Sequence, residues 1–301
     1  MNLANQPLVS VVIPCYNHEN FVQDCIQSVI DQTYQNIELI IIDDGSKDNS
    51  VEKIEEMIPA CKKRFTHFEF RYRPNKGLSA TLNEALEWCD GKYFSSIASD
   101  DMLFLDKIDI QVEYLERQIK VAGVFGNVEV LQNHLEVPIV KKNKKKIIKS
   151  FDFNDVINHR FILWAPTQML KLDVLKKIGG FKDGIIIEDW YLWLKITQIG
   201  YRLDYISQSF AYYRRHESNM SSNYDKMHKG RLDVLNYFSD NLNLSEPKAN
   251  IFLVTANDYL SVNKMKSLNY FRQAVKTCPK LLLNFYFNFK LIKYLLKFIV
   301  V

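Results

Sequence analysis

The sequence lacks the cysteine pattern of a disulfide-bonded or zinc-binding protein. Its 301 residues include five cysteines, an odd number, and no two of them have C-x-x-C spacing. We therefore expect neither a disulfide framework nor a zinc site, and a reducing compartment suits such a chain. The opening MNLANQPLVS also lacks the charged segment and the apolar segment of a signal peptide, so we expect a cytoplasmic protein.

A strong excess of one charge is absent as well. The formal net charge is +4, with 47% apolar and 25% charged residues, which is an ordinary composition for a soluble globular protein. The length suffices for one large domain with an appendage or for two modest domains. Because nucleic-acid-binding proteins carry a strongly basic face, we expect no nucleic-acid partner.

A glycine-rich phosphate loop is missing after the first predicted strand. The β-branched run of residues 8–13 (LVSVVI) ends at Pro14 and continues into the turn-like Tyr16, Asn17 and His18. A dinucleotide-binding dehydrogenase would have G-x-G-x-x-G at this position. The same absence leaves a nucleotidyltransferase without support.

Strand and helix patterns alternate through the first hundred residues. Short apolar runs bounded by breakers predict buried strands, and apolar residues at helical spacing predict helices between them. The predicted strands are 8–13, 37–42, 68–73 and 93–98, and the predicted helices are 21–31, 51–58 and 78–89. This order favours a parallel α/β sheet with helices on both faces. Further along, we expect strands at 121–131 and 206–213, helices at 172–178 and 188–199, and a helical region from about residue 225.

Three polar clusters follow predicted strands, at 14–18, 43–46 and 99–101. Ligands of parallel α/β sheets bind beyond the carboxyl ends of the strands, so we expect the three clusters at one rim. The adjacent carboxylates of Asp100 and Asp101 repel each other unless a cation compensates, and Mg2+ and Mn2+ bind carboxylate and phosphate oxygens. Each acidic pair is also compatible with an ordinary turn or helix cap.

Taken together, the ordered motifs resemble the inverting glycosyltransferase family 2. The stretch SVVIPCYNHENFVQDCIQSVIDQTYQNIELIIIDDGSKDNS looks like the opening of that family. Later pieces agree in order: NKG at 75–77, GKY at 91–93, SDD at 99–101, GGF at 179–181, EDW at 188–190 and YRRH at 213–216. The resemblance covers roughly residues 8–220. It implies a GT-A fold, which is Rossmann-like with a mostly parallel sheet flanked by helices, in a catalytic domain at 1–222 with a helical C-terminal region at 223–301.

The resemblance also implies a binding site for a nucleotide-sugar donor. Pro14 and Tyr16 would line the nucleobase pocket, in the same turn as Asn17. Asp44 would accept a hydrogen bond from the base, while Asp43 supports the turn.

Further donor contacts follow from the same resemblance. Lys76, or Arg73 just before it, would lie near the base or the phosphates, and Asp100 would contact the ribose or the sugar. Arg214 or Arg215 would neutralise the leaving diphosphate, a task that suits the guanidinium group.

A metal site is implied at the end of the fourth predicted strand. Asp101 would be the principal ligand of Mn2+ or Mg2+, and His216 would complete the metal shell or donate to the diphosphate. The family often has an Asp where this sequence has Ser99, so a full D-x-D triplet is absent.

The candidate catalytic base is Asp189. Inversion requires a group that removes the proton of the acceptor hydroxyl on the face opposite the leaving diphosphate, and Glu188 is the rival for this role. First-turn acids that only stabilise a helix are the structural alternative. Trp164 and Trp190 are candidates for stacking on the acceptor sugar, with core packing as their alternative.

The C-terminal tail, residues 280–301, predicts a contact with a membrane. Its length approaches a membrane span, but Lys290, Lys293 and Lys297 interrupt it on one helical face, as in a helix that lies on an anionic leaflet. The lysine-rich segment 141–149 would add a second contact. The alternatives are a terminal helix packed on its own domain or in a homo-oligomer interface.

We therefore predict a metal-dependent glycosyltransferase on the cytoplasmic face of the inner membrane. It would move a sugar from a UDP-sugar to a lipid-linked glycan acceptor in the synthesis of an envelope polysaccharide such as O-antigen or capsule. GDP and dTDP remain open as the nucleotide. A teichoic-acid-like polymer or a protein as acceptor, and a degenerate sugar-nucleotide-binding scaffold, are the alternatives.

Overall fold

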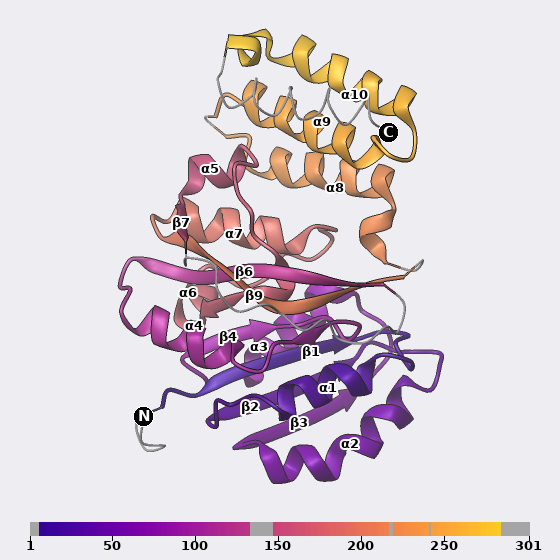
Figure 1. Cartoon of the computed structure of the whole chain (residues 1–301), viewed down its shortest axis with the longest axis vertical. Coiled ribbons are helices and arrows are strands. Elements are labelled where there is room, and N and C mark those ends of the chain that lie inside the picture. The colour runs from indigo at the N-terminus through magenta and orange to yellow at the C-terminus, as the bar shows by residue number, and fades with distance from the viewer. Residues whose placement is uncertain (1–5, 133–146, 217–218, 241, 284–301) are drawn as a thin grey trace. The chain divides into compact units, whose positions relative to one another are not determined.

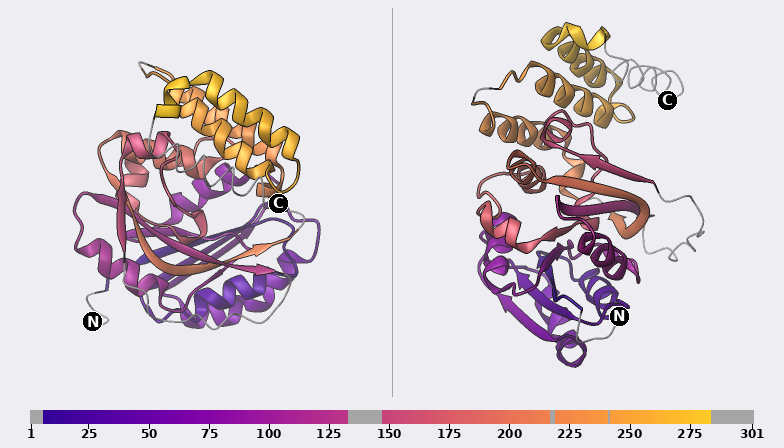
Figure 2. Two further views of the ribbon diagram at one scale, coloured as in Figure 1. Left: turned by 45° about the horizontal axis from the view of Figure 1, so that its top comes forward. Right: turned by 90° about the vertical axis from the view of Figure 1, so that its left-hand side faces the viewer.

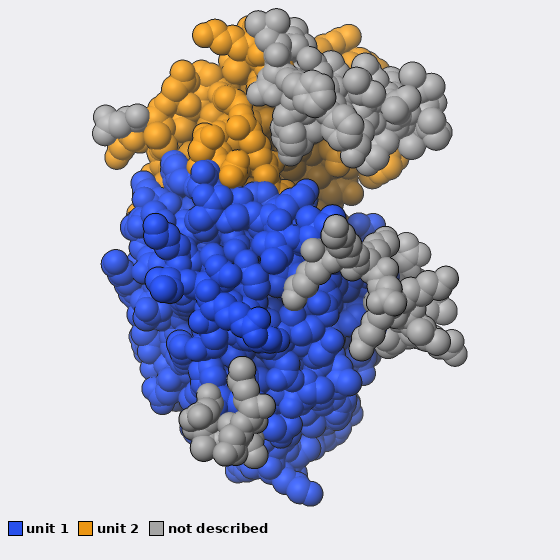
Figure 3. Space-filling view, turned by 60° about the vertical axis from the view of Figure 1, so that its left-hand side comes forward, with its two compact units in different colours: residues 1–153, 162–184, 192–216 blue, residues 154–161, 185–191, 217–301 orange. Residues whose placement is uncertain are grey.

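The computed structural model describes residues 6–132, 147–216, 219–240 and 242–283 (Figure 1). It divides into two compact units, shown in Figure 3. Unit 1 comprises residues 1–153, 162–184 and 192–216, and unit 2 comprises 154–161, 185–191 and 217–301. The lysines at 141–146 and the tail from residue 284 lie outside the described residues.

A nine-stranded sheet forms the centre of unit 1, in the order β3-β2-β1-β4-β8-β6-β9-β5, with β7 paired to β9. Its strands are β1 (Val9–Cys15), β2 (Ile37–Asp43), β3 (His67–Tyr72), β4 (Tyr93–Ser96), β5 (Met102–Leu103), β6 (Val121–Gln132), β7 (Ile148–Phe151), β8 (Met169–Lys171) and β9 (Arg202–Arg215). Strands β1 to β4 are parallel, β6 is parallel to β9, and β8 runs antiparallel to both β4 and β6. The predicted α/β class is confirmed, and the antiparallel strands are confined to the half of the sheet beyond β4.

Helices cover both faces of the parallel part of the sheet (Figures 1 and 2). Successive side chains of a strand point to opposite faces, and β1 is buried on both. The face of Val9, Val11 and Ile13 packs in one core with α1 (Val22–Ile30), α2 (Ser50–Arg64) and α4 (Lys107–Glu116). Helix α3 (Leu78–Trp88) also contacts β1 and β2, and α6 (Leu172–Lys177) contacts β8.

The strand register places the polar clusters at one edge. Cys15 at the end of β1 is opposite Asp43 at the end of β2, and Asp43 is opposite Tyr72 at the end of β3. On the other side of β1, Val12 is opposite Ser96, the last residue of β4. The segments that follow these four strands therefore begin at the same carboxyl edge, as the alternation of strands and helices predicted.

The described residues of unit 2 beyond 219, which end at 283, are mostly helical and confirm the helical pattern from about residue 225 in that range. It contains η3 (Met220–Ser222), α8 (Tyr224–Tyr237), α9 (Ser245–Tyr259), α10 (Lys264–Thr277) and η4 (Pro279–Leu283). Two asparagines cap helices in the usual way: Asn223 accepts a hydrogen bond from the backbone of Lys226, and Asn263 accepts one from Lys266. Among the described residues, none of the helices combines the length and the apolar composition that crossing a bilayer requires.

Three further helical elements lie between β7 and β9 in the sequence. They are α5 (Phe153–Ile157), η2 (Ala165–Thr167) and α7 (Glu188–Gln198). The first turn of α7 belongs to unit 2 and the rest of that helix to unit 1.

Candidate functional site

The carboxylate of Asp44, just after β2, holds the loop that follows β3. Its Oδ1 accepts a hydrogen bond from the backbone N–H of Lys76 (2.8 Å), and its Oδ2 accepts one from that of Gly77 (2.9 Å). Arg73 forms an ion pair with the same carboxylate. The guanidinium also donates from Nε to Glu84 at 2.7 Å and from Nη2 to Thr81 at 3.0 Å. Asp44 and Arg73, which we predicted to bind the donor, therefore contact each other.

The neighbouring Asp43 stabilises its own turn. Its Oδ1 accepts hydrogen bonds from the backbone of Gly45 (3.1 Å) and Ser46 (2.8 Å), and its Oδ2 accepts one from the Ser46 hydroxyl (2.6 Å). The side chain is fully buried. This geometry agrees with the supporting role that the resemblance implied for Asp43.

The turn after β1 is tied to the turn after β2 through Asn17. Asn17 has a φ of 55°, in the left-handed region that asparagine tolerates better than most residues. Its backbone N–H donates to the Ser46 hydroxyl (2.8 Å), and its Oδ1 accepts from the backbone of Lys47 (2.7 Å). Tyr16 is 47% exposed and Pro14 is half-buried, so the Tyr16 ring is accessible at the rim.

Two histidines, His18 and His216, lie beside Asp100 in the loop after β4. Nε2 of His216 lies 2.8 Å from Oδ2 of Asp100, and Nε2 of His18 lies 4.0 Å from the same oxygen. Nδ1 of His18 is 2.7 Å from the hydroxyl of Ser99, and the ring of His216 stacks on Phe21 with centroids 5.0 Å apart. Burial lowers the pKa of His18, and the charge of Asp100 opposes that shift.

Asp101 contacts the backbone of β9. Its Oδ1 accepts a hydrogen bond from the backbone N–H of Arg214 (2.9 Å), and the residue is 2% exposed. Burial, followed by the charge of Asp100, raises the pKa of Asp101 well above its usual value. The structure thus separates the adjacent carboxylates, and it brings Asp100 rather than Asp101 beside His216.

The predicted role of Arg214 does not agree with its position, because its guanidinium is buried among protein groups. It donates from Nε to the backbone carbonyl of Asp100 (2.9 Å) and from Nη2 to Asp24 (3.0 Å), and it lies over the ring of Phe21. Arg215, the alternative that we predicted for the same role, is exposed. Arg214 thus holds the segment around Asp100, and the assignment of Arg214 or Arg215 to the diphosphate stays a prediction.

A divalent cation fits the residues at the rim. One ligand atom each from His18, Asp100 and His216 lie within 4.8 Å of one another. One carboxylate and two imidazoles supply both oxygen and nitrogen donors. Asp101 is not part of this group, and its assignment as principal ligand stays a prediction.

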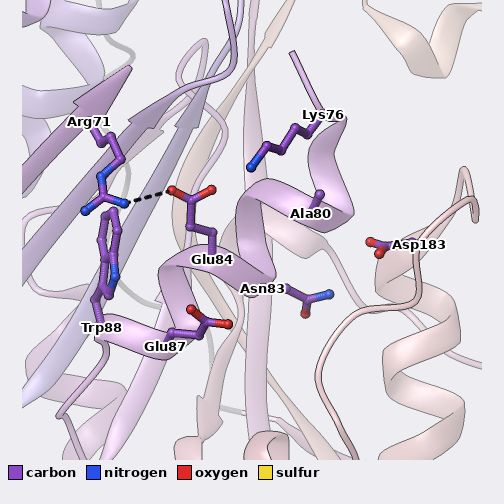
Figure 4. Close-up of a pocket in the computed structure, with 8 residues that line it drawn as sticks. All are labelled: Arg71, Lys76, Ala80, Asn83, Glu84, Glu87, Trp88 and Asp183. Atoms are coloured by element: carbon purple, nitrogen blue, oxygen red, sulfur yellow. Dashed lines mark hydrogen bonds and ion pairs between the residues drawn. The ribbon is translucent and has the colours of Figure 1, made fainter. Parts of the chain in front are cut away.

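The side chain of Lys76 lies along a cleft on the outer side of α3 (Figure 4). The cleft has a volume of about 430 Å3 and is also lined by Arg71, Glu84, Glu87 and Trp88. Lys76 is exposed. Its backbone, rather than its ammonium group, contacts Asp44.

Glu188 and Asp189 occupy the first turn of α7, in unit 2. Both are half-buried, and burial is the largest cause that raises their pKa values. The pKa of Asp189 rises to about 6, opposed by hydrogen bonding to the backbone of Trp190 and by the charge of Arg231. The pKa of Glu188 rises to about 8, with the charge of Asp189 as the second cause. Asp189 is therefore the member of the pair that ionises first.

The two tryptophans predicted for the acceptor differ in exposure. Trp164 is 43% exposed and lies near Tyr213, with centroids 6.4 Å apart. Trp190 is 2% exposed and donates to the backbone carbonyl of Val156 (3.0 Å), and its ring lies tilted against that of His159 with centroids 4.1 Å apart. The ring of Trp190 packs in the core of unit 2, as its alternative of core packing expects, and its assignment to the acceptor stays a prediction.

The sequence pattern assigns no role to His18, which lies in the polar turn after the first predicted strand. A histidine after a strand is by itself a weak signal for a ligand. His18 and Ser99, which are in contact, are 81 positions apart in the chain. A contact between residues so far apart cannot be predicted from a local sequence pattern.

Comparison with known proteins shows the family of the chain. Residues 10–179 match the sequence profile of the family described as "Glycosyl transferase family 2". The Escherichia coli UDP-Glc:alpha-D-GlcNAc-diphosphoundecaprenol beta-1,3-glucosyltransferase WfgD is 30% identical over 236 residues, which are 78% of this chain and 87% of that protein. A glycosyltransferase of Rickettsia felis is 29% identical over 196 residues, which are 64% of this chain and 32% of that protein.

Two solved structures share the fold. S. aureus TarS in complex with UDP-GlcNAc aligns with a TM-score of 0.61 and 15% identity, over 96% of this chain and 89% of that one. The mannosyltransferase PcManGT from Pyrobaculum calidifontis, in complex with GDP-Man and Mn2+, aligns with a TM-score of 0.64 and 15% identity, over 99% and 87% of the two chains. At this level of identity the likeness concerns the fold alone.

Proposed function

The chain belongs to glycosyltransferase family 2, and from that premise we propose that it is an inverting, metal-dependent enzyme that transfers a sugar from a UDP-sugar to a lipid-linked glycan. The acceptor would belong to an envelope polysaccharide such as O-antigen or capsule. The observation that carries the proposal is that two groups of polar residues lie at the same edge of the sheet. They are the Asp44–Arg73 pair after β2 and β3, and Asp100 with His18 and His216 beyond β4, β1 and β9.

The donor half of this proposal rests on the loops at the carboxyl edge. The exposed Tyr16, in the loop after β1, offers a ring on which a base can stack, and the Asp44–Arg73 pair lies in the loops after β2 and β3 at the same edge. Binding of a nucleotide here would require that the loop at 73–77 keep its shape, which the contacts of Asp44 with Lys76 and Gly77 ensure.

The metal requirement rests on the donor groups around Asp100. Asp100 and His216 would hold the ion, and Asp101 remains a candidate ligand. A divalent cation held there would neutralise negative charge on the diphosphate, and the diphosphate would become a better leaving group. The exposed Arg215, next to His216 in the sequence, would add positive charge near the diphosphate.

The base would be Asp189. A general base must be ionised to accept a proton and works best when its pKa lies near the working pH. The raised pKa of about 6 leaves Asp189 largely ionised at neutral pH while Glu188, with a pKa of about 8, stays largely protonated. We assign proton removal from the acceptor hydroxyl to Asp189 on this difference.

The lipid-linked acceptor is supported by the relative WfgD, which is named as a glucosyltransferase acting on alpha-D-GlcNAc-diphosphoundecaprenol. Contact with the cytoplasmic face of the inner membrane through the tail at 280–301 belongs to the same proposal. Cosedimentation of the full chain with anionic vesicles tests it, with glutamate at Lys290, Lys293 and Lys297 as the variant. Undiminished binding of the variant would contradict a role of the tail.

The transfer reaction itself is tested with purified protein, Mn2+ and a panel of UDP-, GDP- and dTDP-sugars. We expect thermal stabilisation by one UDP-sugar, since a ligand at 100 times its Kd stabilises by about 2.7 kcal/mol. With a short-chain lipid diphosphate sugar as acceptor, we expect product and release of UDP. Asp189→Asn should still bind the donor without forming product. Binding of a nucleotide-sugar by the wild type without any turnover would favour the scaffold alternative.

A further inference from the structure

Two imidazoles face one carboxylate at the rim of unit 1. Nε2 of His18 lies 4.0 Å from Oδ2 of Asp100, and Nε2 of His216 lies 2.8 Å from it. Two histidines and one carboxylate, with other coordination positions open to a ligand, form a donor set of transition-metal sites. Mg2+ takes oxygen ligands and keeps several waters, so a site rich in imidazole suits it poorly.

Contacts of its other atoms hold His18 in this orientation. Nδ1 lies 2.7 Å from the hydroxyl of Ser99, and the backbone N–H donates to the hydroxyl of Ser50 (2.8 Å). The ring is also edge-on to Phe21 and His216, with centroids 5.9 and 5.8 Å away. Metal-ligating histidines almost always use their second ring nitrogen for such a hydrogen bond, which fixes the tautomer and the orientation of the ring.

We propose that His18 is a ligand of the divalent metal, that Ser99 positions it, and that this second imidazole makes the site select Mn2+ over Mg2+. The inference rests on the proposed function, because the same ion serves the sugar donor. Ser99 is 1% exposed, and its hydroxyl binds the ring of His18 and would not bind the ion itself. His18 comes from the loop after β1 and Asp100 from the segment after β4, so the ion would also join two loops of the rim.

The competing explanation is that the contact between His18 and Ser99 only ties two loops together. Electron spin echo spectroscopy of the full chain loaded with Mn2+ and UDP distinguishes the two, because it counts the histidine nitrogens bound directly to Mn2+. We expect two in the wild type, one in His18→Gln and one in His216→Gln. His67→Gln is the matched control and should keep two, since His67 lies at the start of β3 with a side chain 54% exposed.

Metal affinities, measured by calorimetry with UDP present, give a second readout. Loss of a partner that orients a metal ligand costs roughly 10–100-fold in affinity, so Ser99→Ala should weaken Mn2+ binding by about tenfold. His18→Gln should weaken it further, and Mg2+ binding should change much less, so that the preference for Mn2+ falls.

A single histidine nitrogen in the wild type would overturn the inference, and so would an unchanged Mn2+ affinity in a folded His18→Gln variant. If His18→Gln fails to fold, the wild-type spectrum and Ser99→Ala decide. A wild type that binds no Mn2+ also overturns it. Two further measurements, binding of UDP-sugar without metal and formation of product, test the proposed function. A failure of the proposed function can therefore be distinguished from a failure of this inference.

Discussion

Nε2 of His216 lies 2.8 Å from Oδ2 of Asp100, a residue 116 positions earlier in the chain. The contact joins the segment after β4 to the residue that follows β9. It also gives the adjacent acids different surroundings: Asp100 faces the histidines, while Asp101 accepts a hydrogen bond from the backbone of β9. Substitutions at the two positions should therefore fail in different ways.

Asp100→Asn should lose Mn2+ binding and keep its fold, because the amide removes the negative charge at the metal position. Asp101→Ala should instead lose about 1–3 kcal/mol of unfolding free energy, the typical cost of a buried donor left without its acceptor. Asp101→Asn should be less destabilised, since the amide oxygen still accepts from Arg214. Urea unfolding and Mn2+ titration measure these two properties. Loss of Mn2+ binding in Asp101→Asn but not in Asp100→Asn would restore Asp101 as the principal ligand.

The rate of transfer should rise with pH as Asp189 ionises. A base acts only when deprotonated, and burial raises the pKa of Asp189 to about 6, so kcat/KM should increase through about pH 6 and then level off. Glu188→Gln should keep this profile, since glutamine resembles the protonated Glu188. Asp189→Asn should remove activity at every pH. An activity loss in Glu188→Gln equal to that in Asp189→Asn would transfer the role of base to Glu188.

Arg73→Lys should weaken binding of UDP by about tenfold, which corresponds to about 1.4 kcal/mol. The guanidinium contacts Asp44, Glu84 and Thr81 at once, and a single ammonium group cannot reproduce this fork. Arg71→Lys is the control, because Arg71 is half-exposed and its contacts are a surface pair with Glu84 (3.4 Å) and the ring of Trp88, away from Asp44. Calorimetry with UDP in the absence of metal makes the comparison, and equal affinities in the two variants would argue against a role of Arg73 at the donor.

Gly45→Ala should disturb the donor rim more than an alanine at another glycine of positive φ. Gly45 has a φ of +80°, and a Cβ there would lie 2.7 Å from the backbone nitrogen of Asn75 and 3.1 Å from the carbonyl oxygen of Arg73. Gly179 has a φ of +83° with nothing within 4 Å of such a Cβ. Gly179→Ala should therefore lose only about 1–2 kcal/mol of unfolding free energy, the cost of a left-handed backbone at a residue with a Cβ. Gly45→Ala should lose more unfolding free energy and should also bind UDP more weakly. Thermal unfolding measures the stability of the two variants, and calorimetry measures their affinity for UDP. Equal losses of stability in the two variants would mean that the loop at 73–75 moves aside without a free-energy cost.

Much of the fold was predictable because the strands β1 to β4 and the helices between them carry regular apolar patterns. Strands β5, β7 and β8 were not predicted, since each has four residues or fewer and exists only through pairing with distant strands. Helix α4 was also not predicted, although Ile108, Val112 and Leu115 have helical spacing and pack in the core.

The sequence by itself determined the chemistry available to this protein: the family motifs, their order, and their place at the ends of parallel strands. Only the tertiary structure decided which members of those motifs face one another. Asp101 points to the backbone of Arg214, 113 positions away, and Trp190 and Arg214 are buried where their residue types suggested contact with a ligand. The physical reason is that the direction of a side chain depends on partners far along the chain. The two neighbours Asp100 and Asp101 therefore have different environments although their local sequence is shared.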